Sequence, residues 1–276
     1  MDLAYWGFGR WPFARQRTVN HASLGASHEE ALARLLFLVD ECRRCGLLTG
    51  AAGTGKSCLF RRVKSYAQRR GRFCLNIDAT GVGATELAWR IAEQLLADCE
   101  PHAPPARCWS LIQQQLANQT LVGQPVVALV DQMDLAEDGV AVILRRLMNL
   151  AESSGTQLTL LVAARSSFST AELRDEIELS VELTGWSLDE TSLFVTDSLR
   201  TAGATSDIFS PESISAVHEI TRGIPGDVVR VCDLSLLAAM NDGRTEIDAE
   251  IVEAAVAELD PRRMLFADRS PAAQRA

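Results

Sequence analysis

The sequence has no apolar run long enough to cross a membrane. Its hydrophobic stretches fall short of the roughly 18 to 20 residues that a membrane-spanning helix needs, although 47% of its 276 residues are hydrophobic. The first residues, Met1 to Trp6, also lack the basic start and apolar stretch of a secretory signal. We therefore expect a cytoplasmic protein without a membrane span, large enough for one large domain or for a large and a small domain.

The sequence lacks a cysteine framework of the disulfide or zinc type. Its seven cysteines are an odd number and are scattered through regular-looking segments, which is typical of reduced thiols at apolar positions. Cys42 and Cys45 form a single CxxC pair, without a second pair or a histidine at ligand spacing. We interpret this pair as the end of a helix leading into a strand, rather than as a zinc or redox site.

Lysine is scarce, and the charge balance is acidic. Only Lys56 and Lys64 are lysines among the 27 basic residues, so the position of a lysine is informative here. The net charge of −9 argues against a protein that binds nucleic acid with its whole surface, but it is compatible with a local basic patch. Such a patch comprises Arg61, Arg62, Lys64, Arg69, Arg70 and Arg72. It is either a DNA contact or a solvated helix face.

Short apolar runs alternate with helical patterns between residues 27 and 186. An amphipathic helix is expected from His28 to Arg44, where leucines and a valine recur at helical spacing. Five apolar runs are interpreted as strands, at residues 47–49, 73–78, 126–131, 158–163 and 181–183. Their alternation with helices predicts a doubly wound α/β domain with a five-stranded parallel sheet.

The remaining sequence divides into three segments. Residues 1–26 are rich in aromatics and arginines and form either a lip on the main domain or a docking segment. Residues 187–260 predict a small helical domain, with helices at about 188–202, 211–222, 225–241 and 248–259. Residues 261–276 are expected to be a flexible tail.

Residues 50–57 match the phosphate-binding pattern GxxxxGK[ST], between a predicted strand and a predicted helix. Glycines let successive backbone N–H groups turn toward a phosphate, and the helix N-terminus adds a favourable dipole. Lys56 would reach the β- and γ-phosphates of ATP, and Ser57 would bind Mg²⁺. The predicted nucleotide-binding set is Gly50, Ala51, Ala52, Gly53, Thr54, Gly55, Lys56, Ser57 and Cys58. The alternative is a glycine-rich turn that binds nothing.

The apolar strand 126–131 ends in Asp131, a second candidate ligand for Mg²⁺. One complete strand, 73–78, precedes it after the phosphate loop, an order typical of P-loop ATPases with an added central strand (the ASCE type). A catalytic acid usually follows this aspartate, but here Gln132 does. Because glutamine orients a water but accepts no proton, slow turnover is predicted. Asp134 is either a substitute base or the cap of a helix that begins near Leu135.

Five short motifs occur together along residues 5–260. They are Tyr5-Trp6-Gly7-Phe8 with Pro12-Phe13, Ser27 through Leu35, Leu48 through Ser57, Gly223-Ile224-Pro225, and Cys232 through Ala239. In this combination they resemble the general secretion pathway protein A (ExeA-like) AAA+ ATPases, whose relatives include transposition regulators and origin-recognition-like proteins. The resemblance implies an AAA+ fold, in which the α/β domain is followed by a helical lid.

The resemblance also implies a homo-oligomer with nucleotide between neighbouring subunits and an arginine finger supplied in trans. Arg174, on a helix predicted before the fifth strand, stands at the place of that finger; a solvated helix-end arginine is the alternative. Arg165 or Ser166 occupies the place of the γ-phosphate sensor after the fourth strand.

Two departures from the family pattern bear on activity. The family often has an arginine directly after Gly-x-Pro in the lid, where this sequence has Gly226; Arg230 follows one helical turn later. The membrane span and wall-binding part of the full-length secretion proteins have no counterpart in these residues, so a role in secretion gains little support.

These patterns favour an ATP-dependent switch or motor with slow intrinsic hydrolysis of ATP to ADP and phosphate. The rival reading is an ATP-binding assembly scaffold or DNA-associated regulator that scarcely hydrolyses ATP. A small-molecule kinase on the same loop would need an acceptor site, and the long C-terminal helical region fits the AAA+ reading better.

Overall fold

The computed structural model describes residues 3–13, 25–95, 99–100, 103–169 and 171–257. Internal contacts divide the chain into two compact units. The sheet unit comprises Glu30–Gly50 and Lys56–Leu183, and the helical unit comprises Met1–Glu29, Ala51–Gly55 and Thr184–Ala276. The middle of the phosphate loop therefore has its contacts in the helical unit.

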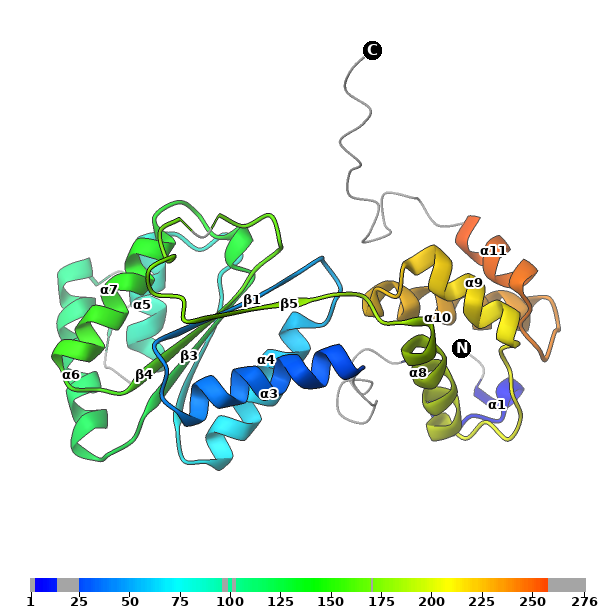
Figure 1. Ribbon diagram of the computed structural model, residues 1–276, viewed down its shortest axis with the longest axis horizontal. Coiled ribbons are helices and arrows are strands. Elements are labelled where there is room, and N and C mark those ends of the chain that lie inside the picture. The colour runs from blue at the N-terminus through cyan, green and yellow to red at the C-terminus, as the bar shows by residue number, and fades with distance from the viewer. Residues whose placement is uncertain (1–2, 14–24, 96–98, 101–102, 170, 258–276) are drawn as a thin grey trace, which may run out of the picture. The chain divides into compact units, whose positions relative to one another are not determined.

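The sheet unit is built on a five-stranded parallel sheet (Figure 1). The strands are β1 (Cys45–Gly50), β2 (Phe73–Asp78), β3 (Val126–Asp131), β4 (Leu158–Ala163) and β5 (Leu179–Leu183), in the order β2-β3-β4-β1-β5. The central strands β3 and β4 are continuous apolar runs because both of their faces are buried. The structure confirms the predicted parallel sheet, with β1 and β5 each beginning two residues earlier than expected.

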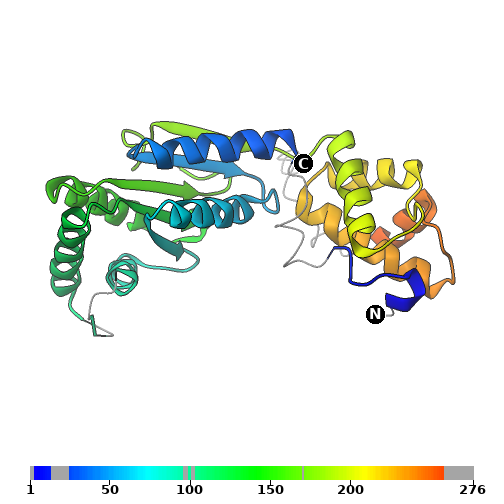
Figure 2. The ribbon, with the colours of Figure 1, turned by 90° about the horizontal axis from the view of Figure 1, so that it is seen from below.

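Helices cover both faces of this sheet. One face packs in a single apolar cluster with α5 (Ala84–Gln94), α6 (Pro105–Leu121) and α7 (Val140–Ser153). On the other side lie α4 (Lys56–Arg69) and α3 (Ala26–Asp40), which Figure 2 brings into view from below. The approach of α3 to the sheet is so close that a Cβ on Gly46 would collide with Leu38. This contact explains why β1 carries glycine at that position.

The helical unit contains α8 (Leu188–Ala202), α9 (Pro211–Thr221), α10 (Pro225–Asn241) and α11 (Ala249–Ala257). The sequence signals at the helix starts act as expected, because Ser187 forms a capping box with Glu190 and the Ser210 side chain accepts a hydrogen bond from Ser213 N. Pro225 opens α10, where its missing N–H costs nothing.

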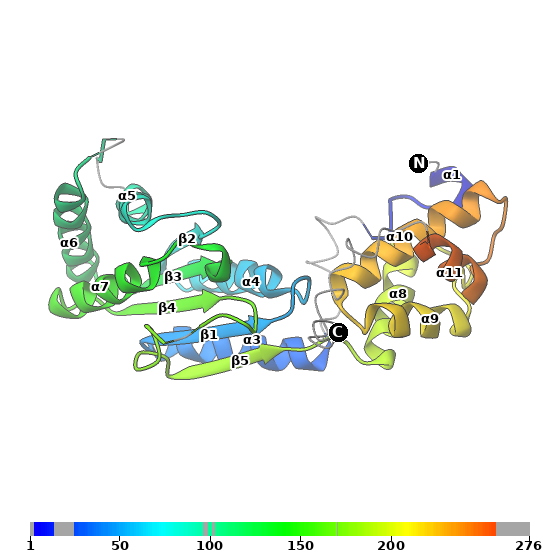
Figure 3. The ribbon, with the colours of Figure 1, turned by 90° about the horizontal axis from the view of Figure 1, so that it is seen from above.

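The N-terminal segment packs on the helical unit. Its short helix α1 (Leu3–Trp6) lies near the end of α10 in Figure 3, and the Tyr5 hydroxyl donates a 2.9 Å hydrogen bond to Arg244 O. Trp6, Phe8 and Phe13 are buried in the core of this unit. Trp11 Nε1 donates a 2.6 Å hydrogen bond to Asp233 Oδ1 on α10. The described part of this segment therefore packs on the helical unit, and not on the main domain as the first of the two alternatives had it.

Two helix predictions were wrong. No α-helix lies among the described residues between β4 and β5, where Arg174 was expected on one; residues 171–176 form turns instead. The helix expected from Leu135 begins only at Val140, after a short 3₁₀ turn over Met133–Leu135 (η1). In that turn the backbone closes bonds three residues apart, from Leu135 N to Gln132 O, which ends the helix before it can extend.

No helix among the described residues is both long and apolar enough to cross a membrane.

Candidate functional site

The phosphate loop connects the end of β1 to the start of α4. Its backbone is left-handed at Gly53 (φ 80°) and Gly55 (φ 101°), a conformation that side chains with a Cβ rarely adopt. Thr54 is fully buried, and its hydroxyl donates a 2.9 Å hydrogen bond to Ala51 O, which fixes the turn. The sequence therefore folds into the tight strand-to-helix turn that the motif predicts.

Lys56 is the first residue of α4, and Ser57 is the second. The Lys56 ammonium donates a 2.7 Å hydrogen bond back to Gly50 O, at the other end of the loop. Burial lowers the pKa of Lys56, while the charges of Asp134 and Asp131 act in the opposite direction. A partly buried ammonium at the N-terminus of a helix, next to the backbone N–H groups of a tight turn, favours the binding of an anion.

Asp131 is the last residue of β3, at the same edge of the sheet as the phosphate loop. Its Oδ1 accepts a 2.9 Å hydrogen bond from Gln132 N, which orients the carboxylate. In the parallel register, Asp131 stands opposite Asp78, the last residue of β2. Two carboxylates and the Ser57 hydroxyl are oxygen donors of the kind that Mg²⁺ prefers.

Gln132 is held in an unusual conformation. Its backbone is left-handed (φ 57°, ψ 39°), which is uncommon for a residue other than glycine and marks local strain. Its side-chain Nε2 donates to both carboxylate oxygens of Asp78, at 3.2 Å each. Hydrogen bonds from Thr80 lower the pKa of Asp78 and keep this acceptor ionised.

Asp78 was missed as a site residue by the sequence reasoning. The available signal was an acidic residue at the carboxyl end of a strand that neighbours the strand of Asp131. That adjacency follows from the strand order, which the sequence alone does not specify.

Asp134 does not cap a helix as the sequence allowed. Its Oδ1 accepts a 3.0 Å hydrogen bond from Arg165 N, and its Oδ2 lies 3.1 Å from Arg165 Nε. Of the two candidate sensors after β4, Arg165 is thus paired with Asp134, whereas the Ser166 hydroxyl donates a 3.0 Å hydrogen bond to Glu182 Oε1. Both oxygens of the Asp134 carboxylate therefore contact Arg165.

The middle of the phosphate loop is held within the helical unit. The buried His28 ring donates from Nε2 to Thr54 O at 2.6 Å, and Gly226 N donates to Gly53 O at 3.0 Å. Burial lowers the pKa of His28, against the raising effects of the Thr54 hydrogen bond and the Glu190 charge, so the neutral ring is favoured. The sequence reasoning assigned neither contact, because it treated His28 only as a helix start.

The stretch from residue 39 to residue 171, which carries this loop and the aspartates, matches the family model described as AAA domain. Residues 39–171 are therefore similar to AAA domains. This match covers slightly less than half of the chain.

The resemblance that the motifs predicted is confirmed by a related sequence. Over 258 residues the chain is 25% identical to general secretion pathway protein A of Aeromonas hydrophila. The aligned region covers 90% of this chain and 46% of that protein. The chain thus spans about half of the length of this relative.

Solved structures share the fold of the chain. Cdc6p from Pyrobaculum aerophilum superposes with a TM-score of 0.72 at 16% identity, over 94% of this chain and 71% of that one. The Aeropyrum pernix ORC1 protein, solved in complex with DNA, has a TM-score of 0.68 at 15% identity, over 90% and 68% of the two chains. The RuvB Holliday junction branch migration motor of Thermotoga maritima has a TM-score of 0.56 at 16% identity, over 87% and 73%. They confirm the predicted AAA+ P-loop fold with a C-terminal helical region.

Arg174 lies in the sheet unit, in the exposed turn before β5. Among the described residues, no hydrogen bond or ion pair joins its side chain to Lys56, Asp131 or Gln132. Arg230, on α10, lies 3.4 Å from the fully buried Asp227 carboxylate of the same helix. Within the sheet unit, Arg174 is thus outside the cluster around Asp131.

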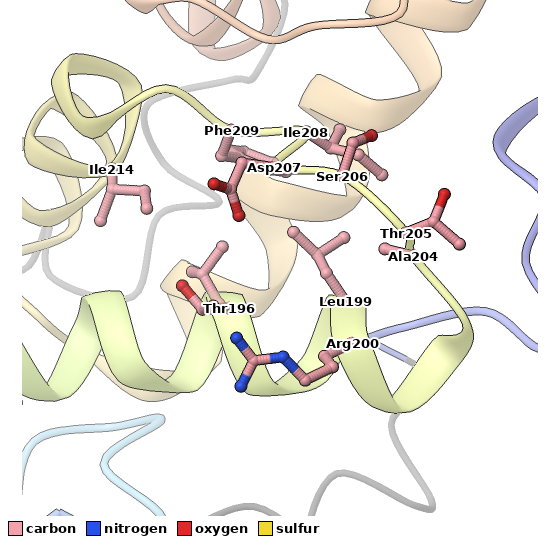
Figure 4. A pocket seen from close by; sticks show the side chains of 11 residues that line it. Thr196, Leu199, Arg200, Ala204, Thr205, Ser206, Asp207, Ile208, Phe209 and Ile214 are labelled. Atoms are coloured by element: carbon pink, nitrogen blue, oxygen red, sulfur yellow. The ribbon is translucent and has the colours of Figure 1, made fainter.

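The helical unit contains a cavity whose lining includes no residue of the phosphate loop. That cavity, about 190 Å³, lies between α8 and the segment that leads to α9 (Figure 4). Thr196, Leu199 and Arg200 of α8 face Asp207 and Phe209 across it. Its lining mixes apolar and charged side chains and includes no residue of the predicted site.

Proposed function

We propose that the chain is an ATP-dependent switch or motor that binds ATP with Mg²⁺ in the loop Gly50–Ser57 and hydrolyses it slowly. The observation that carries this proposal is the left-handed turn at Gly53 and Gly55, followed directly by the half-buried ammonium of Lys56. Such a turn presents backbone N–H groups to phosphate oxygens, and the ammonium adds the charge that a triphosphate requires.

The residues at the sheet edge fit a magnesium nucleotide. Ser57 and Asp131 would hold the metal directly or through its waters, and Lys56 would exchange its bond to Gly50 O for a phosphate oxygen. The bound metal supplies charge neutralisation for the leaving phosphate. Asp78, opposite Asp131 in the register, holds the Gln132 amide in place beside it.

Slow turnover follows from how the polar groups near Asp131 are used. Gln132 accepts no proton, and its amide is bound to Asp78. Asp134, the other candidate base, is paired with Arg165. Neither of these two groups therefore offers an unpaired carboxylate next to Asp131 within a single chain.

Steady-state phosphate release tests the switch against the scaffold. We expect the full chain to release phosphate slowly with Mg²⁺ and ATP, and Lys56→Ala to reduce this rate to background. Lys64→Ala is the matched control, since it removes the only other lysine from the same helix. No release above the Lys56→Ala background, with ATP binding intact, would establish the scaffold instead.

We also propose that the active form is a homo-oligomer with Arg174 acting on the nucleotide of a neighbouring subunit. The exposure of Arg174 on the sheet unit supports this assignment, because an arginine that acts in trans must be free to reach a second copy. Particle size with and without ATP, compared between the chain and Arg174→Ala, tests it. We expect ATP to increase the particle size and the turnover of the unaltered chain, and Arg174→Ala to abolish this increase. A turnover that does not depend on protein concentration would contradict the proposal.

A second candidate function is contact with DNA through α4. Arg61, Arg69 and Arg70 are exposed there, while Arg72 is bonded to Asp40 O and Cys42 Sγ. Helix-end arginines also stabilise a helix dipole, which is the competing explanation for Arg69.

Duplex binding over a salt series separates the two explanations for α4. If the helix contacts phosphates, replacing Arg69 and Arg70 by alanine lowers the salt slope by about one for each lost contact. Arg200→Ala, which removes an exposed arginine from the helical unit, is the control. An affinity that does not depend on salt would rule DNA contact out.

A further inference from the structure

Two cysteines of the sheet unit lie close enough for their sulfur atoms to touch. Cys99 Sγ and Cys108 Sγ are 3.5 Å apart, although the residues are separated by nine positions in the chain. Cys99 precedes α6 and packs partly against the apolar core, whereas Cys108 is in the first turns of α6 and is buried. A disulfide has a sulfur–sulfur bond of about 2.05 Å, so bond formation needs an approach of about 1.5 Å.

The other five cysteines have different surroundings. Cys42 Sγ contacts the Arg72 guanidinium and the Gln157 amide, and Cys58 Sγ accepts from Arg61. Cys74 Sγ donates to the backbone carbonyls of Lys64 and Arg72. Burial raises the pKa of Cys45 to about 12 and that of Cys232 well above its usual value, which makes both thiols inert. Among the described residues, Cys99 and Cys108 are the only cysteines whose sulfur atoms are in contact.

We propose that Cys99 and Cys108 form a reversible intramolecular disulfide when the protein meets an oxidising low-molecular-weight disulfide. The Cys99 thiolate, the more accessible of the two, attacks oxidised glutathione and forms a mixed disulfide, releasing one glutathione thiolate. Cys108 then loses its proton, attacks the Cys99 sulfur and expels the second glutathione thiolate. Two protein thiols thereby lose two protons and two electrons, and oxidised glutathione is reduced to two molecules of glutathione.

The bond would close a ring of ten residues, from Cys99 to Cys108, at the junction of α5 and α6. The site lies on the helical layer that covers one face of the sheet, and none of its residues belongs to the phosphate loop. The proposal therefore does not depend on ATP binding or hydrolysis. It describes a redox modification that the spacing in the sequence gave no reason to expect, since no CxxC motif is involved.

A peptide map tests the proposal on the full chain. The protein is incubated with oxidised glutathione, its remaining thiols are blocked, and it is digested with trypsin under non-reducing conditions. Trypsin cuts after Arg90, Arg107 and Arg145, so Cys99 and Cys108 fall on separate peptides, 91–107 and 108–145, that contain one cysteine each. We expect these two peptides linked, lighter than their sum by two hydrogen atoms, and separated again by dithiothreitol.

Variants identify the partners. Cys99→Ser and Cys108→Ser should each abolish the linked pair, and Cys42→Ser should leave it unchanged. Glutathione retained on Cys99 while Cys108 stays open to alkylation would overturn the proposal. So would a linked pair that joins any other cysteines, or complete alkylation of all seven cysteines after oxidation.

Discussion

The two parts of the sheet edge use their polar groups differently. In the phosphate loop, the Lys56 ammonium is bonded to the backbone carbonyl of Gly50, a partner that a phosphate oxygen readily replaces. Beside Asp131, the polar groups are bonded to each other: Gln132 to Asp78, and Asp134 to Arg165. The part that would hold the triphosphate is ready for a ligand, whereas the part that would activate water is occupied by internal pairs.

Removing the metal ligand should have the largest effect on this contrast. Asp131→Asn keeps the size of the side chain but removes its negative charge. We therefore expect turnover to fall about 100-fold, equivalent to ~3 kcal/mol of transition-state stabilisation. Phosphate release at saturating magnesium and ATP measures it. Asp138→Asn, an exposed acid on the same connection to α7, is the control and should be unaffected. Equal rates for Asp131→Asn and the unaltered chain would show that Asp131 is not at the metal.

Exchanging the two members of the Gln132–Asp78 pair should raise turnover. The double variant Gln132→Glu with Asp78→Asn keeps an amide facing a carboxylate but puts the carboxylate next to Asp131, so we expect about a 10-fold to 100-fold increase in phosphate release.

The single variant Gln132→Glu sets a control for that exchange. It places two carboxylates at the 3.2 Å contact, where mutual repulsion disfavours an ionised carboxylate held beside Asp131. We expect its rate to change by less than about threefold. A single variant as fast as the double variant would show that Asp78 does not restrain position 132.

The contact of His28 with the phosphate loop should make the stability of the chain depend on pH. In the folded chain burial lowers the pKa of His28 below its usual 6.5, so folding favours the neutral ring. This contribution is fully present above pH 6.5 and is lost as the pH falls through the lowered pKa. We expect His28→Ala to cost about 1–2 kcal/mol at neutral pH, by removing the donor to Thr54 O, and to flatten this part of the pH profile.

Denaturant titration between mildly acidic and neutral pH measures this prediction. His218→Ala serves as the control. It removes the other described histidine of the helical unit, whose side chain is hydrogen-bonded to Thr191, and this variant should still lose stability at acidic pH. A profile for His28→Ala that parallels the unaltered chain at every pH would refute a role for the ring in holding the loop.

Much of the fold could be predicted from local patterns. The strand Val126–Asp131 is an unbroken apolar run that ends in a charge, and the structure begins and ends it at the predicted residues. The phosphate loop was predictable for the same reason, because its glycines and Lys56 act through the backbone of one short segment. Where a single continuous segment determines the structure, its sequence is sufficient.

The rest depended on contacts between distant segments. The pair of Gln132 and Asp78 requires β2 to lie beside β3, and His28 reaches Thr54 across 26 positions. The segment around Arg174 forms turns instead of the expected helix. Glu178 N donates a hydrogen bond to Cys45 O, so the chain already pairs with the sheet there, and the segment before it is too short to nucleate a stable helix. These outcomes follow from tertiary hydrogen bonds that local periodicity does not encode.

The central claim is that the loop Gly50–Ser57 binds a magnesium nucleotide through Lys56, and equilibrium binding of a fluorescent ATP analogue tests it most directly. We predict binding that requires Mg²⁺, is retained by Lys64→Ala, and is weakened about 100-fold by Lys56→Ala, as expected for the loss of a charge-assisted hydrogen bond to phosphate. Binding of equal strength by Lys56→Ala and the unaltered chain, or no magnesium-dependent binding by the unaltered chain, would contradict the claim.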